Sequence, residues 1–205
     1  MAFLLILGIV AVVAAGLVAA ALYKSGKDAD KKFSKDSVSS VCKNCPKKTG
    51  QLDKKHFVQE KNNSCVIASS RNMIAMLTGK DVKESTLRDE MKTIMKKPNH
   101  DFNKNGINPK HAVTLLKNHG VDTEIKKNQS NKDLENLTAK GKPVLIGFKN
   151  PGHRVMLDSV TTNKDGSKTY NVRDPDPAYK GKPRNMSEAD FNKKYNKNAI
   201  VVAPK

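Results

Sequence analysis

Four residues of types that cooperate in amide chemistry occur in a fixed order along the 205-residue chain. Cys65 begins an expected helix, where unpaired N–H groups and the helix dipole stabilise a thiolate, the nucleophilic form of cysteine. Gln59 lies six residues earlier, from where its amide can fold back and complete an oxyanion hole with a backbone N–H. His153 begins an expected strand and Asp174 ends the neighbouring one, so antiparallel pairing can bring the imidazole and the carboxylate together.

Two other aspartates compete with Asp174 for the role of orienting His153. Asp158 shares a strand with His153, but five residues along one strand put it on the opposite face and about 16 Å away. Asp176 follows Asp174 by two residues and is the closer rival. The remaining histidines fall in loops or on an expected helix, so we assign them no catalytic role.

Helices are expected first and strands second in the part of the chain that carries these residues. Capping and stop signals predict four helices, over 65–78 with Ser64 as its cap, 85–97, 109–119 with Asn108 as its cap, and from Ser130 to about Gly141. Strands are predicted over 143–149, 153–161, 169–174 and 199–203, with a hairpin turn over 163–166, and a last helix capped by Ser187 runs over 188–195. This segregation predicts an α+β domain whose N-terminal helices pack on a C-terminal antiparallel sheet.

The chain before this domain divides into two segments of unlike composition. Residues 2–23 carry no charge, and a 22-residue helix is long enough to cross a bilayer, so 1–23 is predicted to insert into or cross a membrane. A cleaved signal and a buried core helix are the alternatives. Residues 24–55 are rich in Lys, Ser, Asp and Gly and predict a basic, flexible linker, which leaves 56–205 as the catalytic domain.

The linker contains the only other cysteines, Cys42 and Cys45, in a C-x-x-C pair. Such a pair is half of a zinc site or a local disulfide, and His56 is the nearest further ligand. Because the second half of a zinc motif is missing, a solvated thiol pair is the simpler interpretation. Neither a metal nor a cofactor is expected to take part in the chemistry.

The net charge of +18 comes from 38 Lys and Arg against 20 Asp and Glu, and only five of the 38 are Arg. This excess predicts an anionic partner, and a basic module that binds nucleic acid or anionic lipid is one alternative to an enzyme. Aromatic residues make up only 5% and no nucleic-acid motif is present, which disfavours direct nucleic-acid binding. The charge is compatible instead with an acidic or DNA-associated protein substrate.

The order of Gln59, Cys65, His153 and Asp174, together with the segments GKPVLIGF, VRDP and SEADFNKKY, resembles the papain-like cysteine peptidases over about residues 56–203. The similarity is strongest to the bacteriocin-processing peptidases that cut leaders after a double glycine. It implies Cys65 as nucleophile, His153 as general base and acid, Asp174 as orienting residue and Gln59 as oxyanion donor. Those leader peptidases usually have an acidic residue or Asn before the cysteine and Gly after it, where this chain has Ser64 and Val66.

A short basic chain with an apolar head also resembles the papain-like toxin domains of bacterial competition systems. This resemblance implies a cysteine protease toxin that is membrane-associated or exported, acts in the cytoplasm of a competing bacterium and has a cognate immunity protein as inhibitor. Leader processing, deamidation or transglutamination by the same triad, and a catalytically dead peptide-binding domain remain as alternatives.

Overall fold

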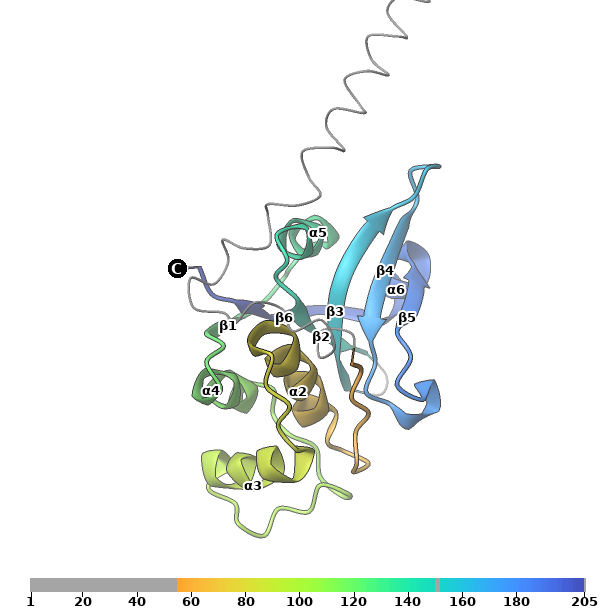
Figure 1. Cartoon of the computed structure of the whole chain (residues 1–205). Helices are drawn as coiled ribbons and strands as arrows, with labels where there is room; N and C mark the ends of the chain where they lie inside the picture. Colours follow the sequence, from red (N-terminus) through yellow and green to blue (C-terminus); the bar gives the residue numbers. More distant parts are fainter. Residues whose placement is uncertain (1–54, 150–151, 205) are drawn as a thin grey trace, which may run out of the picture. The chain divides into compact units, whose positions relative to one another are not determined.

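The computed structural model describes residues 55–149 and 152–204 (Figure 1). The predicted apolar helix over 2–23, nearly all of the predicted linker, and the Cys42–Cys45 pair lie outside these residues, so they stay predictions. Among the described residues no helix has the length and apolar character needed to span a membrane.

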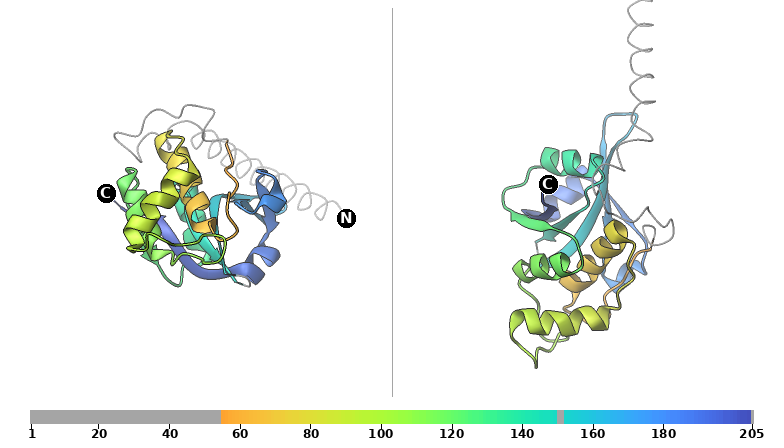
Figure 2. Two further views of the ribbon diagram at one scale, coloured as in Figure 1. Left: turned by 90° about the horizontal axis from the view of Figure 1, so that it is seen from below. Right: turned by 60° about the vertical axis from the view of Figure 1, so that its left-hand side comes forward.

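Three helices, α2 (Cys65–Thr78), α3 (Glu84–Met95) and α4 (Lys110–Asn118), cover one face of the sheet. Figure 1 shows them together at the lower left, and both views in Figure 2 keep α3 beside α4. Their inward residues form one apolar cluster with three sheet residues, Leu145, Met156 and Ile200. The i, i+3, i+4 spacing of apolar residues within each helix produces this buried face.

The sheet has six antiparallel strands in the order β1-β6-β2-β3-β4-β5. The strands are β1 (Thr123–Lys126), β2 (Val144–Phe148), β3 (His153–Thr162), β4 (Lys168–Arg173), β5 (Arg184–Ser187) and β6 (Tyr195–Val202). The predicted hairpin turn between β3 and β4 is confirmed, since Asn163 N–H donates to the Ser167 carbonyl and Gly166 has a φ of 83°. Strands β1 and β5 were not predicted, and β6 begins four residues earlier than expected.

The opposite face of the sheet is also covered, by α5 (Asn131–Ala139) and α6 (Glu188–Lys194). Successive strand residues point to opposite faces, and β2 is buried at all five positions because helices lie on both sides of it. An α+β domain with an antiparallel sheet is confirmed, but the expectation that the four N-terminal helices precede every strand is wrong for one strand. The short strand β1 comes before α5, whereas α6 precedes β6 as predicted.

The predicted helix caps hold at Ser130 and Ser187, whose hydroxyls accept from the N–H groups of Asp133 and Asp190. Ser64 does stand at the N-cap position of α2, but its side chain makes no capping bond, so that prediction is wrong. Its hydroxyl is 2.7 Å from Glu84 Oε1 on α3, a buried carboxylate that the sequence did not reveal as a partner. The third helix begins at Lys110, one residue later than predicted.

Asn72, which is fully buried on α2, holds the segment that leads into the domain. Its Oδ1 accepts from the N–H of Phe57 (2.9 Å), and its Nδ2 donates to the Phe57 carbonyl (2.9 Å) and the Ala68 carbonyl (3.0 Å). One side chain thereby satisfies both backbone groups of a residue that sits against α2 without a strand partner. The entry segment is fixed to α2 through this amide.

Asn72→Ala is expected to lower the free energy of unfolding by about 2 kcal/mol or more, because it leaves both buried backbone groups of Phe57 without partners. Urea denaturation followed by circular dichroism measures the change. Asn118→Ala is the matched control, since Asn118 makes one exposed bond to Glu90 on the surface, and it should cost about 0.5 kcal/mol or less. Equal losses in the two variants would contradict the assignment.

Candidate active site

Cys65, His153 and Asp174 converge where α2 begins, β3 begins and β4 ends. Cys65 is the first residue of α2 and His153 the first of β3, while Asp174 directly follows the last residue of β4. Helix α2 packs across β3 in Figure 1, and the buried hydroxyl of Ser69 donates to the Arg154 carbonyl at 2.9 Å. This bond joins the middle of the helix to the residue after His153 and fixes the spacing between the thiol and the imidazole.

The imidazole of His153 is bonded to the Asp174 carboxylate, with 2.6 Å between Nε2 and Oδ1. The register of β3 and β4 explains this contact. Met156 pairs with Arg173, so His153, three residues before Met156, and Asp174, directly after Arg173, lie at the same end of the hairpin. Since Nε2–H donates to Asp174, Nδ1 is the ring nitrogen left for Cys65, and the two side chains are hydrogen bonded. Asp174 is almost fully buried, whereas His153 keeps 20% of its side chain exposed.

The electrostatics of these groups favour a thiolate beside an imidazolium. Burial opposes ionisation of Cys65, but its hydrogen bond with His153, the charge of that ring and the N–H groups of Arg154 and Val66 outweigh burial and lower the thiol pKa. Burial also disfavours the charged form of His153, yet its bonds to Asp174 and Cys65 raise its pKa to about 9. The lowered thiol pKa favours the thiolate, and a histidine with a pKa of about 9 carries a proton at neutral pH.

The Asp174 carboxylate is held from two sides. Oδ1 also accepts from the N–H of Asp176 (3.2 Å), and Oδ2 accepts from Arg184 Nη1 (2.9 Å) on β5, the guanidinium of which lies over the Tyr179 ring. Burial raises the pKa of Asp174, but the bond and the charge of His153, with these two donors, bring it below its ordinary value. Asp174 is thus an oriented, ionised acceptor.

The two rival aspartates are engaged elsewhere. Asp158 Oδ2 accepts from Arg173 Nε at 2.6 Å, and burial raises the pKa of this carboxyl. Asp176 caps the 3₁₀ turn η1 (Pro177–Tyr179) by accepting from the Ala178 N–H. The structure therefore brings Asp174, and neither rival, to His153.

Gln59 lies on the segment that leads into α2, and its N–H donates to the Pro175 carbonyl at 2.8 Å. Its side-chain Nε2 donates to the carbonyls of Lys61 (3.0 Å) and Asn62 (2.8 Å), inside the loop that ends at Cys65. Both amide protons are used by this loop, so donation to an oxyanion requires one of these bonds to open. The predicted oxyanion role of Gln59 stays a prediction.

The loop before Cys65 is anchored by Glu84, a fully buried carboxylate on α3 that was not foreseen. Its Oε1 accepts from the Ser64 hydroxyl and from Arg88 Nη1 (2.8 Å), and its Oε2 accepts from the Glu60 N–H (3.0 Å). Where leader peptidases usually place an acidic residue next to the cysteine, this chain has a serine that is hydrogen bonded to a carboxylate from another helix. Arg184, Ser69 and Glu84 are the residues of the site that sequence reasoning missed.

The described residues contain no cluster of His, Cys, Asp and Glu that could bind a metal ion. His56, the suggested third zinc ligand, points its Nε2 at the Asp174 carbonyl (2.8 Å). Burial lowers the pKa of His56 and that bond opposes the shift. His56 therefore braces the backbone of the site in the neutral form, in which Nε2–H donates.

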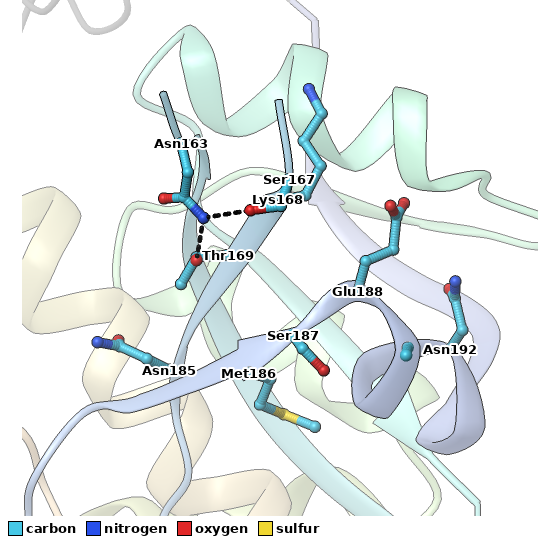
Figure 3. Close-up of a pocket in the computed structure, with 10 residues that line it drawn as sticks. Asn163, Ser167, Lys168, Thr169, Asn185, Met186, Ser187, Glu188 and Asn192 are labelled. Carbon is cyan, nitrogen blue, oxygen red and sulfur yellow. Dashed lines mark hydrogen bonds between the residues drawn. The ribbon is translucent and has the colours of Figure 1, made fainter. Parts of the chain in front are cut away.

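A cavity of about 670 Å³ opens at the far end of the β3–β4 hairpin, next to β5 and α6 (Figure 3). Its walls are mostly amide and hydroxyl side chains, and Figure 3 shows Asn163 bonded to Ser167 and Thr169. Because His153 is the first residue of β3 and Asn163 follows its last residue, this cavity is separate from the catalytic residues.

Comparison with solved structures shows the same fold. The peptidase domain of Streptococcus ComA, a bifunctional ABC transporter involved in quorum sensing, is 21% identical with a TM-score of 0.55, over 74% of this chain and 98% of that domain. A double glycine motif protease from an AMS/PCAT transporter, solved with its leader peptide, is 18% identical with a TM-score of 0.54, over 73% and 91%. A C39-like peptidase of Bacillus anthracis, described as putative in its own structure, is 16% identical with a TM-score of 0.52, over 75% and 97%.

No curated protein matches the chain. The family model described as "Peptidase_C39 like family" matches residues 51–201, which is most of the chain and includes every candidate site residue. The match agrees with the papain-like arrangement of a helix-borne cysteine facing a histidine on an antiparallel strand. The chain belongs to the Peptidase_C39 like family and is a papain-like cysteine peptidase.

Proposed function

We propose that Cys65, His153 and Asp174 hydrolyse peptide bonds through an acyl-enzyme formed on Cys65. The observation that carries this proposal is the series of partly buried contacts from the Cys65 thiol to His153 and on to Asp174, which lowers the pKa of the thiol and raises that of the imidazole. Such a pair holds the nucleophile and the proton donor ready in the same site.

In the first step the thiolate adds to the substrate carbonyl carbon, and the carbonyl electron pair moves onto oxygen. The N–H groups at the start of α2 have no partners within the helix and can donate to that oxyanion. When the tetrahedral intermediate collapses, the C–N bond breaks and the imidazolium of His153 gives its proton to the leaving amine. Cys65 is then an acyl thioester and His153 is neutral.

In the second step neutral His153 takes a proton from water as the oxygen adds to the thioester carbon. The C–S bond then breaks with its electron pair on sulfur, which regenerates the thiolate beside an imidazolium. Asp174 keeps Nε2 protonated, so Nδ1 is the atom that exchanges protons in both steps. One water is consumed for each bond cleaved.

For the substrate we propose a leader-type peptide cut after small residues. The support is the fold shared with a double glycine motif protease whose structure contains a leader peptide. Ser64 and Val66 flank the nucleophile differently from the pattern usual in leader peptidases, so the preferred residues near the cut are proposed to differ. The excess of basic residues favours acidic segments elsewhere in the substrate.

A toxin role is the second candidate, and the observation that favours it is the uncharged stretch over residues 2–23 ahead of a basic domain. In this proposal the chain is membrane-associated or exported, cleaves a cytoplasmic protein of a competing bacterium and is restrained by an immunity protein. Deamidation or transglutamination would use the same thiolate and imidazolium.

Peptide cleavage is tested by incubating the full chain with peptides that carry a Gly-Gly site and with a bacterial protein extract, followed by mass spectrometry. Fragments are expected, and Cys65→Ala should abolish them because no other described residue supplies a thiol. Cys42→Ser/Cys45→Ser is the matched control and should retain cleavage. Intact products slightly heavier than the substrate would identify a deamidase and overturn the peptidase proposal.

The pH dependence of Cys65 alkylation and of hydrolysis should separate above about pH 9. Alkylation by iodoacetamide needs only the thiolate, so its rate should persist there, whereas hydrolysis needs the imidazolium and should fall as His153 loses its proton near pH 9. His153→Ala should raise the thiol pKa and slow alkylation at neutral pH. Both rates are measured in the Cys42→Ser/Cys45→Ser background, and a common alkaline limb would contradict the ion pair.

Arg184→Met should lower kcat by about tenfold with little change in KM, because Asp174 loses the donor that fixes its second oxygen. Losing this cation also strengthens the pull of Asp174 on the His153 proton, so the alkaline limb of the pH profile should move upward. Arg184→Lys should restore part of both effects. A lower rate with an unmoved limb would assign Arg184 a purely structural role.

A further inference from the structure

Arg154, the residue after His153, is a buried cation for which the structure shows no carboxylate partner. It is 7% exposed, and its Nη1 makes two long bonds, to the carbonyls of Leu145 (3.3 Å) and Asn198 (3.4 Å). Nε is buried without any acceptor among the described residues. No Asp or Glu oxygen of the described residues lies within 4.0 Å of its guanidinium, whereas the other four arginines all have such a partner.

The sheet leaves a path for this side chain. Arg154 on β3 pairs with Gly147 on β2, and β6, which carries Asn198, lies beyond β2. A side chain that starts on β3 and bonds to a carbonyl of β6 therefore crosses β2, at the level where β2 has no side chain. A Cβ at Gly147 would lie 2.4 Å from the Asn196 amide, so the glycine leaves room for the Asn196 side chain at this level of β2.

An unpaired buried charge is costly, and the surroundings of Arg154 offer one compensating anion. The Arg154 carbonyl accepts from Ser69, one turn after Cys65 on α2, which places the Arg154 backbone beside the start of that helix, and the Arg154 N–H helps to lower the pKa of the Cys65 thiol. The negative charges that raise the pKa of the guanidinium are those of Cys65 on α2 and Tyr195 on β6. Burial raises the pKa of the Tyr195 hydroxyl, so this phenol is neutral and Cys65 is left as the counter-charge.

Burial lowers the pKa of Arg154 and the Cys65 thiolate opposes that shift. A guanidinium nevertheless stays charged throughout the working pH range. It therefore differs from His153, which also faces Cys65 but loses its proton in each catalytic cycle and is itself tied to Asp174.

We propose that Arg154 is a positioning residue, a fixed buried cation that keeps Cys65 ionised independently of the protonation of His153. The inference rests on the proposed role of Cys65 as nucleophile. It assigns Arg154 a specific part of the cycle: when the thioester is hydrolysed, the C–S bond breaks with its electron pair on sulfur while His153 is taking up the water proton. A cation that does not titrate stabilises the departing thiolate at that moment.

The test reads the thiol itself, in the Cys42→Ser/Cys45→Ser background so that only Cys65 reports. The pKa of Cys65 is measured from thiolate absorbance and from the pH dependence of iodoacetamide alkylation. Arg154→Gln, which keeps donors for the carbonyls but removes the charge, should raise the thiol pKa by about one unit and slow alkylation about tenfold below that pKa. Arg154→Lys should restore most of the lost rate.

Arg71→Met is the matched control, since Arg71 is a half-buried arginine of α2 that is paired with Asp81 and lies over the Phe57 ring. It should leave the thiol pKa unchanged. Circular dichroism confirms that each variant is folded, and Arg154→Lys, which retains charge and length, provides the comparison if Arg154→Gln does not fold. If Arg154→Gln does not fold, the thiol pKa of Arg154→Lys should stay within a few tenths of the parent value, and a rise of a full unit would count against the proposal.

A thiol pKa that is the same in folded Arg154→Gln and in the parent overturns the inference, whatever the substrate. If cleavage is absent in the parent while the thiol pKa shifts as expected, the inference holds and the proposed peptidase function fails. With a cleavable ester substrate, Arg154→Gln should show a larger burst of product followed by slower turnover, because expulsion of the thiolate during deacylation becomes limiting. A proportional loss of both phases would also contradict the assigned step.

Discussion

The hydrogen bond from Ser69 to the Arg154 carbonyl sets the distance on which the rest of the site depends. A cysteine on a helix and a histidine on a strand belong to elements that pack through apolar side chains, and such packing alone tolerates small sliding. A buried directional bond does not, because moving it leaves two polar groups without partners. The thiolate and the imidazolium are thereby held at a fixed separation in a region where water screens their charges weakly.

A second set of hydrogen bonds connects the Asp174 carboxylate to the same helix, α2. Asn72 on α2 binds the backbone of Phe57, and the residues around Phe57 bind the backbone that carries Asp174: His56 donates to the Asp174 carbonyl and Gln59 to the Pro175 carbonyl. Cys65 and Asp174 are far apart in sequence, yet both are positioned from α2. The entry segment therefore helps to position the catalytic residues, while the oxyanion role of Gln59 on this segment stays a prediction.

What the sequence predicted well were features that short-range chemistry decides. The caps at Ser130 and Ser187 and the turn ending at Gly166 depend on residues within a few positions of one another. Strand β5, with the sequence RNMS, has no apolar alternation of its own and becomes a strand because the free edge of β4 offers backbone partners. Ser64 was predicted to be a cap for the same local reason, but its hydroxyl donates instead to Glu84, twenty residues away.

The same difference between local features and contacts of distant residues applies to the catalytic site. The types and order of Cys65, His153 and Asp174 were visible, since the cysteine begins a helix and the other two lie at ends of adjacent strands. Their supports were not visible, because Ser69, Glu84 and Arg184 act across elements whose contact only the fold creates. The oxyanion donor is a third case, in which the spacing of Gln59 is suitable but both protons of its amide are bound to the loop.

The scarcity of arginine is a feature of the composition that points to these buried supporting contacts. Most of the basic residues are lysines, and those in the described part are largely exposed, as expected for a compact, strongly hydrated ammonium group. The five arginines lie instead in half-buried or buried positions with defined acceptors: Arg71, Arg88, Arg154, Arg173 and Arg184. A planar guanidinium is less strongly hydrated and donates in fixed directions, so a chain this rich in lysine has a physical reason to use arginine where a cation must be buried. The high net charge therefore describes the surface, while the few arginines mark the interior contacts, and the one among them that lacks a carboxylate is the one beside the thiol.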